Sequence, residues 1–348
     1  PFLGNYRTKQ VENNPKASGS LILKFFVAAE LIFRYFFTSL LPYGNLFTYA
    51  LQYIKNNKVD KILISGSPFM LFKIGYLAKK KFNIPWIADY RDGWTTDNYA
   101  EEAGLLTKPV HILNKYFEKK WMESASAFTT VSEFLKTGIE KYTGVKGFVV
   151  YNGFFAEENI PRPLVADKKS ITFLYSGMLY AKQDYETVVI VFKKLFDKYK
   201  SQIDCKLIFL GTTYANPGFA NNPVFNDYAA NILLMDRVNY AEALKIHEQA
   251  DAFLMLTHEG MKGIVSSKVF DYIKYCRPVI LFTNDHDVLE EILVRSNIGI
   301  IAEDAEKVQH QLYVLIKEKI SKGFIAQNPD REYIALFSRE NQARHLAT

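Results

Sequence analysis

The sequence predicts an α/β protein of two Rossmann-like, doubly wound domains that face each other across a cleft. First, the 348 residues are too many for one ordinary hydrophobic core. Second, from Asp60 onward short apolar runs alternate with segments of helical spacing, which indicates parallel sheets covered by helices on both faces. Third, a polar, proline-bearing stretch at residues 155–169 interrupts this alternation, which then starts again.

The first series of elements comprises four apolar runs and the helical segments between them. Strands are expected at residues 61–68, 84–94, 127–132 and 147–154. Helices are expected at residues 69–83, 105–125 and 133–144. Ser132 precedes the last helix and is its expected N-cap, because a hydroxyl there can accept from a free backbone N–H group.

The second series repeats the alternation after the polar stretch. Strands are expected at residues 170–179, 205–212, 251–256, 277–282 and 298–304. Helices are expected at residues 185–200, 240–250, 286–296 and 305–320, and residues 214–231 are interpreted as a surface excursion. We therefore expect an N-terminal domain at residues 1–153 and a C-terminal domain at 154–330. A C-terminal helix at about 331–348 is expected to pack back on the first domain.

The net charge of +6 is unevenly distributed, with +8 on residues 1–151 and −2 on residues 152–348. A basic first half suits an anionic membrane, a phosphate-bearing substrate or nucleic acid. No RRM, KH, zinc-finger or helix-turn-helix pattern accompanies it, so we expect no nucleic-acid partner. Cys205 and Cys276 form no disulfide or metal pattern, which is typical of a reducing, cytoplasmic compartment.

The most hydrophobic stretch, residues 21–41, is long enough to span a bilayer but contains Lys24, Glu30 and Arg34. On a helical wheel these charges share one half, opposite a wide aromatic and aliphatic face. Two interpretations stay open: a helix packed on the core of its own domain, or a helix in a membrane interface. A true span is the third and least favoured. The chain does not begin with Met, which leaves open that N-terminal sequence is missing.

Polar residues that follow the expected strands are the candidates for function. Ligands of open α/β sheets bind beyond the carboxyl ends of the strands, and two facing sheets form a cleft there. Asp89, Arg91 and Asp92 end the second strand. They could form a strand-end ion pair, but Trp86 and Trp94 beside them suit a sugar or another flat ligand.

The first strand of the second domain ends at Gly177, followed by Lys182 and Gln183 before a helix. Glycine lets the backbone approach a phosphate, the start of a helix offers free N–H groups, and lysine adds a positive charge. Because strand–glycine–helix turns occur throughout α/β proteins, a purely structural role is also open.

Residues 262–282 contain a third group of candidate functional residues, at the expected start of a short helix. Ser266 or Ser267 can cap this helix, and Lys268 and Asp271 lie in its first turn. The helix dipole disfavours a cation there, and an anionic ligand would offset that cost. Asp271 either supports the helix start or accepts hydrogen bonds from ligand hydroxyls.

Several chemistries are not indicated by the sequence. The GxGxxG and GxxxxGK[ST] fingerprints are absent, which argues against a dinucleotide oxidoreductase or a P-loop enzyme. No HExxH or GxSxG motif is present. The six histidines lie at no metal-ligand spacing, and most are expected to be solvated helix residues. We therefore expect no bound metal and no cofactor.

Six segments taken together resemble a known family. They are "KILISGSP", "IPWIADYRDGW", "FTTVSEFL", "VVYNGF", "LYSGMLY" and "SSKVFDYIKYCRPVIL". Their order resembles that of family 4 retaining glycosyltransferases of the GT-B fold, in particular the bacterial enzymes that build capsule, O-antigen and exopolysaccharide. The resemblance runs from about Asp60 to the C-terminus. It implies that the second domain binds a nucleotide-sugar donor (a UDP- or GDP-sugar) and the first binds a glycan acceptor.

The resemblance assigns donor-binding roles residue by residue. Asp271 matches the second acid of the E-x7-E motif, which binds the nucleotide ribose, and this chain has Gly263 where the first acid would stand. Lys268 and the backbone of Ser266 and Ser267 match the diphosphate-binding helix start. Gly177 matches the glycine that approaches the phosphates.

Other matches concern the second basic group and the residues between the domains. The basic residue of the family aligns with Gln183, so Lys182 is expected to supply that charge. Asn152 matches the Asn-Gly at the crossover between domains. Arg91 and Asp92 match the site that faces acceptor and donor sugar, with Asp89 and Trp94 on the acceptor side.

The implied mechanism is sugar transfer with retention of configuration and without a tightly bound metal. Lys182 and Lys268 would stabilise charge on the departing diphosphate, which itself takes the acceptor proton. The expected setting is cytoplasmic, at the inner face of the cell membrane, with a lipid-linked glycan as acceptor. Two alternatives are a GT-B-type sugar-nucleotide epimerase and a degenerate homologue that only binds partners.

Overall fold

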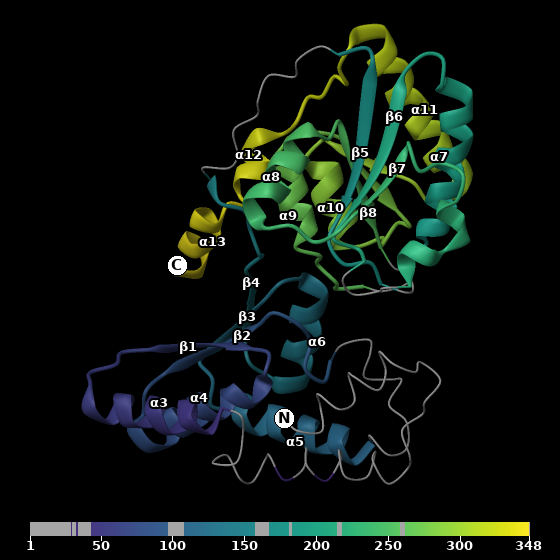
Figure 1. The fold of residues 1–348 in the computed structure, drawn as a ribbon. Helices are drawn as coiled ribbons and strands as arrows, with labels where there is room; N and C mark the ends of the chain where they lie inside the picture. Colours follow the sequence, from purple (N-terminus) through teal and green to yellow (C-terminus); the bar gives the residue numbers. More distant parts are fainter. Residues whose placement is uncertain are drawn as a thin grey trace. The chain divides into compact units, whose positions relative to one another are not determined.

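The computed structural model describes Ala29, Phe33 and residues 43–96, 108–156, 167–180, 183–213, 218–257 and 262–347 (Figure 1). Contacts divide the chain into two compact units, Pro1–Val150 and Tyr151–Thr348. The amphipathic segment expected at residues 21–41 lies outside the described residues, apart from Ala29 and Phe33. Within the described part of the chain, no helix combines the length and apolar character of a membrane span.

The first unit contains a four-stranded parallel sheet in the order β1-β2-β3-β4. Its strands are β1 (Ile62–Gly66), β2 (Trp86–Tyr90), β3 (Ala127–Thr130) and β4 (Gly147–Val149). Its helices are α3 (Gly44–Asn56), α4 (Phe72–Phe82), α5 (Lys108–Met122) and α6 (Glu133–Thr143), with a short 3₁₀ turn at Phe69–Leu71. The strands expected from the sequence are thus confirmed, and α3 is a helix that the sequence reading did not predict.

Aromatic packing fixes the core of the first unit. Trp86 is fully buried against Gly75 of α4, where a Cβ atom would lie 2.2 Å from the indole ring, so only glycine fits. The indole Nε1 donates to Ser124 Oγ at 3.0 Å. Trp86 is therefore a core residue and does not face a ligand, contrary to the expectation that it brackets the charges at the strand end. Ser132 caps α6 as predicted, accepting from the Leu135 backbone N–H group.

The second unit contains a six-stranded parallel sheet in the order β10-β9-β8-β5-β6-β7. Its strands are β5 (Ser170–Ser176), β6 (Asp204–Leu210), β7 (Ile232–Met235), β8 (Ala252–Leu256), β9 (Val279–Phe282) and β10 (Gly299–Ile301). Its helices are α7 (Tyr185–Tyr199), α8 (Tyr240–Gln249), α9 (Lys268–Ile273), α10 (Val288–Arg295), α11 (Ala305–Lys322), α12 (Arg331–Ala335) and α13 (Arg339–Ala347). The chain order reverses between β5 and β8, which makes that pair the switch point of the sheet.

Helices cover both faces of this sheet, each over its own hydrophobic core (Figure 1). One core contains side chains of α7 and α11, among them Phe192 and Leu312. The other contains side chains of α9, α10 and α12, among them Phe270 and Ile292. The doubly wound α/β class predicted from the alternation is confirmed for this unit.

Three parts of the second unit differ from the sequence reading. Strand β7 was not predicted, because a four-residue apolar run directly after the polar excursion gives little periodicity. The excursion itself is not wholly at the surface, since Phe219 and Phe225 are buried in the core beside α7. Most histidines were expected to be solvated, but His247 is buried against the rings of Phe253 and Tyr272.

The C-terminal segment packs within the second unit. Phe337 and Ile334 belong to the core around α9 and α10, and Ser338 pairs with Phe154 in an isolated parallel bridge. At Gly153 a Cβ atom would lie 2.4 Å from the Phe337 carbonyl oxygen, so a side chain does not fit where the two segments cross. The contact boundary at Val150 lies three residues before the predicted one. Packing of residues 331–348 on the first unit stays a prediction.

Candidate functional site

The switch point of the second sheet gathers three of the predicted donor-binding residues. Gly177 follows β5 with a φ of +100°, a conformation that L side chains rarely adopt. A Cβ atom there would lie 2.8 Å from Lys268 Cε, so the glycine gives room to the lysine stem. Gln183 donates from Nε2 to the Leu256 carbonyl at 2.5 Å, which ties the turn after β5 to the end of β8. We call Gly177, Gln183 and Lys268, with Tyr175, the switch-point corner.

Lys268 is the cation of this corner and the first residue of α9. Its Nζ atom donates to Tyr175 Oη at 2.5 Å and to the Met178 carbonyl at 2.6 Å. Burial lowers the pKa of the Lys268 amine to about 7, because low-water surroundings disfavour the charged form. A lysine held in this way needs an anion nearby to be fully charged above neutral pH.

The remaining residues of this segment are placed differently from one another. Ser267 occupies the N-cap position of α9 but, contrary to expectation, makes no side-chain cap hydrogen bond. The backbone closes this turn instead. The Ser266 carbonyl accepts from the Val269 N–H group, and the Ser267 carbonyl accepts from the Phe270 N–H group. Asp271 lies one turn on with its side chain 44% exposed, and its Oδ1 is 4.0 Å from Lys274 Nζ. Asp271 can therefore accept from a ligand.

Gly263 stands where the first acid of the motif would be, and its surroundings are already filled. Its φ is +81°, and its backbone N–H group donates to Asp287 Oδ2 at 2.5 Å. This geometry fits a turn that only glycine adopts readily. Lys182 lies outside the described residues, so its predicted role as a second phosphate contact stays a prediction.

In the first unit, buried hydrogen bonds organise the carboxyl edge of β2. Asp89, 3% exposed, accepts from Ser65 Oγ at 2.6 Å, Thr129 Oγ1 at 2.8 Å and Arg91 Nε at 2.9 Å. Arg91 also donates from an Nη atom to the Val150 carbonyl at 3.3 Å. Asp89 thus orients Arg91 and has little surface left for an acceptor.

The other predicted residues of this edge have separate surroundings. Asp92 is exposed, and Trp94 is stacked on Phe69 with ring centroids 5.3 Å apart. Asn152 is half-buried directly before Gly153. The structure does not describe how the two units sit, so the expected cleft between them stays a prediction.

The sequence reading missed two tyrosines that build the switch-point corner. Tyr175 is the hydroxyl against Lys268, and Tyr272 of α9 accepts from the Ser176 backbone N–H group at 2.8 Å. Both rings are fully buried. In the sequence, the signal for Tyr175 is a tyrosine at the end of an apolar strand run, two residues before Gly177. Among the described residues, no cluster of His, Cys, Asp and Glu could hold a metal ion.

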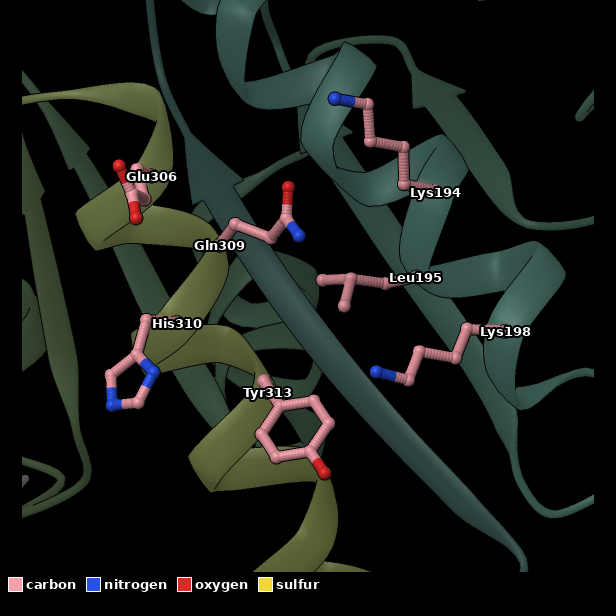
Figure 2. A pocket seen from close by; sticks show the side chains of 7 residues that line it. All are labelled: Lys194, Leu195, Lys198, Glu306, Gln309, His310 and Tyr313. Atoms are coloured by element: carbon pink, nitrogen blue, oxygen red, sulfur yellow. The ribbon is translucent and has the colours of Figure 1, made fainter.

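A groove of about 410 Å³ lies elsewhere in this unit, between α7 and α11 (Figure 2). Its lining residues are Lys194, Leu195, Lys198, Glu306, Gln309, His310 and Tyr313. Lys198 Nζ lies 4.3 Å from the centre of the Tyr313 ring. The groove contains no residue that follows a strand and none of the predicted site residues, so we do not take it as the donor site.

The fold is that of GT-B proteins, which contain two Rossmann-like α/β domains. No family model and no curated protein matches the chain in sequence. Among solved structures, sucrose-phosphate synthase from Thermosynechococcus elongatus has a TM-score of 0.60 at 13% identity, over 89% of this chain and 77% of that one. Anabaena HepE in complex with UDP and glucose has a TM-score of 0.60 at 12% identity, over 88% of this chain and 82% of that one.

A protein with different chemistry has a lower score. The UDP-GlcNAc 2-epimerase of Methanocaldococcus jannaschii has a TM-score of 0.51 at 13% identity, over 87% of this chain and 80% of that one. At such identities the likeness shows the fold alone.

Proposed function

We propose that this protein transfers a sugar from a nucleotide-sugar donor to a glycan acceptor, as a retaining glycosyltransferase. The observation that carries the proposal is the switch-point corner, where Lys268 lies over Gly177 and Asp271 follows one turn later. A glycine turn, a cation and a partly exposed carboxylate at the switch point suit a diphosphate and a ribose. The complex of HepE with UDP-glucose supports a nucleotide-sugar as the ligand proposed for this protein.

Each group has a defined part in the proposed reaction. Asp271 accepts hydrogen bonds from the ribose hydroxyls, and Lys268, with Lys182, stabilises negative charge on the departing diphosphate. The bond between the anomeric carbon and the phosphate oxygen breaks, and the acceptor oxygen bonds to that carbon on the same face. The acceptor proton goes to the departing phosphate, so this route uses no enzymic base and no resident metal.

The acceptor side of the proposal rests on the first unit. Arg91, held by Asp89 and the Val150 carbonyl, presents a fixed cation at the carboxyl edge of β2, with Asp92 exposed beside it. These groups suit the hydroxyls and anionic groups of a glycan. We propose a lipid-linked glycan of a surface polysaccharide, such as capsule or O-antigen, as the acceptor.

We also propose peripheral attachment to the inner face of the cell membrane. Supporting it, α3 exposes Tyr49 and Tyr53 on one side, and the last turn of α4 contains three successive lysines, Lys79–Lys81. Exposed aromatics and lysines in one domain favour an anionic interface. Serine at Tyr49 and Tyr53 is expected to weaken binding to vesicles with anionic lipid at least about five-fold, measured by sedimentation. Unchanged binding, with a wild-type melting temperature, would contradict attachment through α3.

A screen of nucleotide-sugars tests the function directly. The purified protein is expected to gain thermal stability with one class of UDP- or GDP-sugar and to hydrolyse or transfer that sugar. Alanine at Asp271 is expected to weaken donor binding about 30-fold or more, because hydrogen bonds from the ribose to a charged acceptor are lost. Calorimetry measures the dissociation constant.

A matched variant separates the ribose contact from helix stability. Methionine at Lys274 removes the nearby cation but leaves the Asp271 carboxylate, and should preserve most of the affinity. Equal affinity of the Asp271→Ala and wild-type proteins would overturn the ribose assignment. Interconversion of the nucleotide-sugar without transfer would favour the epimerase, and the absence of any nucleotide-sugar binding would favour a protein that only binds partners.

A further inference from the structure

Among the described residues, both hydrogen-bond acceptors of Lys268 in the switch-point corner are neutral. Lys268 Nζ donates to the Tyr175 hydroxyl and to the Met178 carbonyl, and it also lies 4.3 Å from the centre of the Tyr175 ring. Such oxygens orient an amine but supply no full negative charge. A charged lysine in these surroundings is stabilised less than one in water.

Tyr175 is itself fixed by the ends of two strands. Its hydroxyl lies 2.8 Å from the Met178 carbonyl and 3.2 Å from Gln183 Oε1, which also accepts from the Tyr180 backbone N–H group at 2.9 Å. Gln183 in turn donates to Leu256 at the end of β8. The phenol oxygen therefore has a fixed position, and so has the amine that donates to it.

Among the described residues, the titratable groups around this pair do not supply the missing charge. Tyr272 of α9 and Tyr180 of the turn after β5 act electrostatically on Tyr175, and burial raises the pKa of the Tyr175 hydroxyl far above neutral pH, so this phenol stays uncharged. Asp271, the carboxylate on the same helix, has its Oδ1 atom near Lys274 Nζ. Lys182 lies outside the described residues, as do His258 and Glu259.

We propose that Tyr175 is the positioning residue of the diphosphate site, and that a bound diphosphate draws a proton from solvent onto the Lys268 amine. This inference rests on the proposed function, because it assigns the diphosphate of the donor to this corner. The amine gains one proton and the buffer loses one. The ammonium then faces the phosphates from a position fixed by its hydrogen bonds to the Tyr175 hydroxyl and the Met178 carbonyl. The pKa of Lys268, lowered to about 7 by burial, sets where this uptake occurs.

The uptake gives binding a definite pH dependence. The diphosphate of a nucleotide-sugar keeps its charge throughout the range from about pH 6.5 to about pH 8.5, so the ligand phosphates do not titrate. With a midpoint near 7, about 0.9 proton should be taken up per UDP-glucose or GDP-mannose bound at pH 8, and about 0.2 at pH 6.5. Affinity should fall about 25-fold from pH 6.5 to pH 8.5, since the free site loses its proton as pH rises.

Calorimetry in buffers of different ionisation enthalpy counts these protons. Arginine at Lys268 is the matched control, because a guanidinium is charged throughout this range. Lys268→Arg should bind with no proton uptake and with the same affinity at both pH values. Zero uptake by the wild-type protein at pH 8, with binding intact, would overturn the proposal.

An NMR titration of the ligand-free protein tests the proposal without assuming the proposed function. NMR of ¹³C-labelled lysine should show one side chain that titrates near pH 7 and is missing from Lys268→Arg. Phenylalanine at Tyr175 removes the acceptor and should lower that midpoint by about half a unit or more, because a hydrogen bond to the charged form is lost. A purely structural Tyr175 would change the melting temperature and leave the midpoint in place.

The calorimetric binding experiment and the NMR titration distinguish failure of this proposal from failure of the proposed function. If no lysine titrates below about pH 9, the proposal is wrong even when nucleotide-sugars bind. If the lysine titrates near 7 but neither UDP-glucose, GDP-mannose nor any donor of the screen binds, the proposed function is wrong and the uptake step falls with it. Binding, uptake at pH 8 and the lower midpoint of Tyr175→Phe together establish it.

Discussion

Methionine in place of Lys268 is expected to slow sugar transfer about 100- to 1,000-fold, the usual loss when one preorganised charge of an active site is removed. The methionine stem keeps the contact over Gly177, while the charge that faces the departing diphosphate is gone. Because the Lys268 amine is partly desolvated and has neutral partners, its removal should not lower the free energy of unfolding. Single-turnover transfer rates, measured with saturating donor, test this.

Lys262 provides the matched control for this variant. It lies in the same segment, six residues before Lys268, and is exposed. Methionine at Lys262 should transfer at the wild-type rate, so a general effect of lost positive charge would slow both variants equally. A wild-type rate for Lys268→Met would show that the diphosphate does not bind at the switch-point corner.

His247 is expected to make the second unit sensitive to acid. Both ring nitrogens are buried and have no hydrogen-bond partner among the described residues. Burial, with Lys274 nearby, lowers the pKa of the imidazole to about 4. The unfolded chain has an ordinary histidine that protonates near 6.5, so it binds more protons than the folded chain between these values. Stability should therefore be full above about pH 6.5 and fall by about 3 kcal/mol as the pH drops to about 4.

Urea unfolding at several pH values measures this loss. Leucine or phenylalanine at His247 should remove about 3 kcal/mol of the pH dependence, because neither side chain can be protonated. His310, an exposed histidine of α11, is the control, and phenylalanine there should leave the dependence unchanged. An acid dependence that persists in both His247 variants would assign the sensitivity to other groups.

Local patterns were sufficient for the architecture. Apolar runs that alternate with segments of helical spacing predicted the parallel strands of both sheets, because each run must be buried on two faces. Strand β7 and helix α3 were missed for different reasons. The run at β7 has only four residues, too few to establish a period. Helix α3 is amphipathic, with Phe47 and Ile54 on its buried side, so its spacing could have predicted it.

Some features of the candidate site could also be predicted from the sequence, and others could not. Gly177, Lys268 and Asp271 could be predicted because residues after a buried strand must lie at the carboxyl edge of a parallel sheet. The hydrogen bonds of Gln183 and Asp89 could not be predicted, since their partners lie far along the chain, at Leu256 and Thr129. Their roles toward donor and acceptor stay predictions.

The sequence by itself determined two parallel α/β sheets and the residues at their strand ends, because burial of a periodic face is a local property of the chain. Only the tertiary structure decided that Lys268 donates to Tyr175, that His247 is buried with no hydrogen-bond partner among the described residues, and that Phe219 and Phe225 belong to the core. These contacts depend on which strands lie side by side, and β5 and β8 become neighbours although some eighty residues separate them. The local spacing of apolar residues does not predict that β5 pairs with β8.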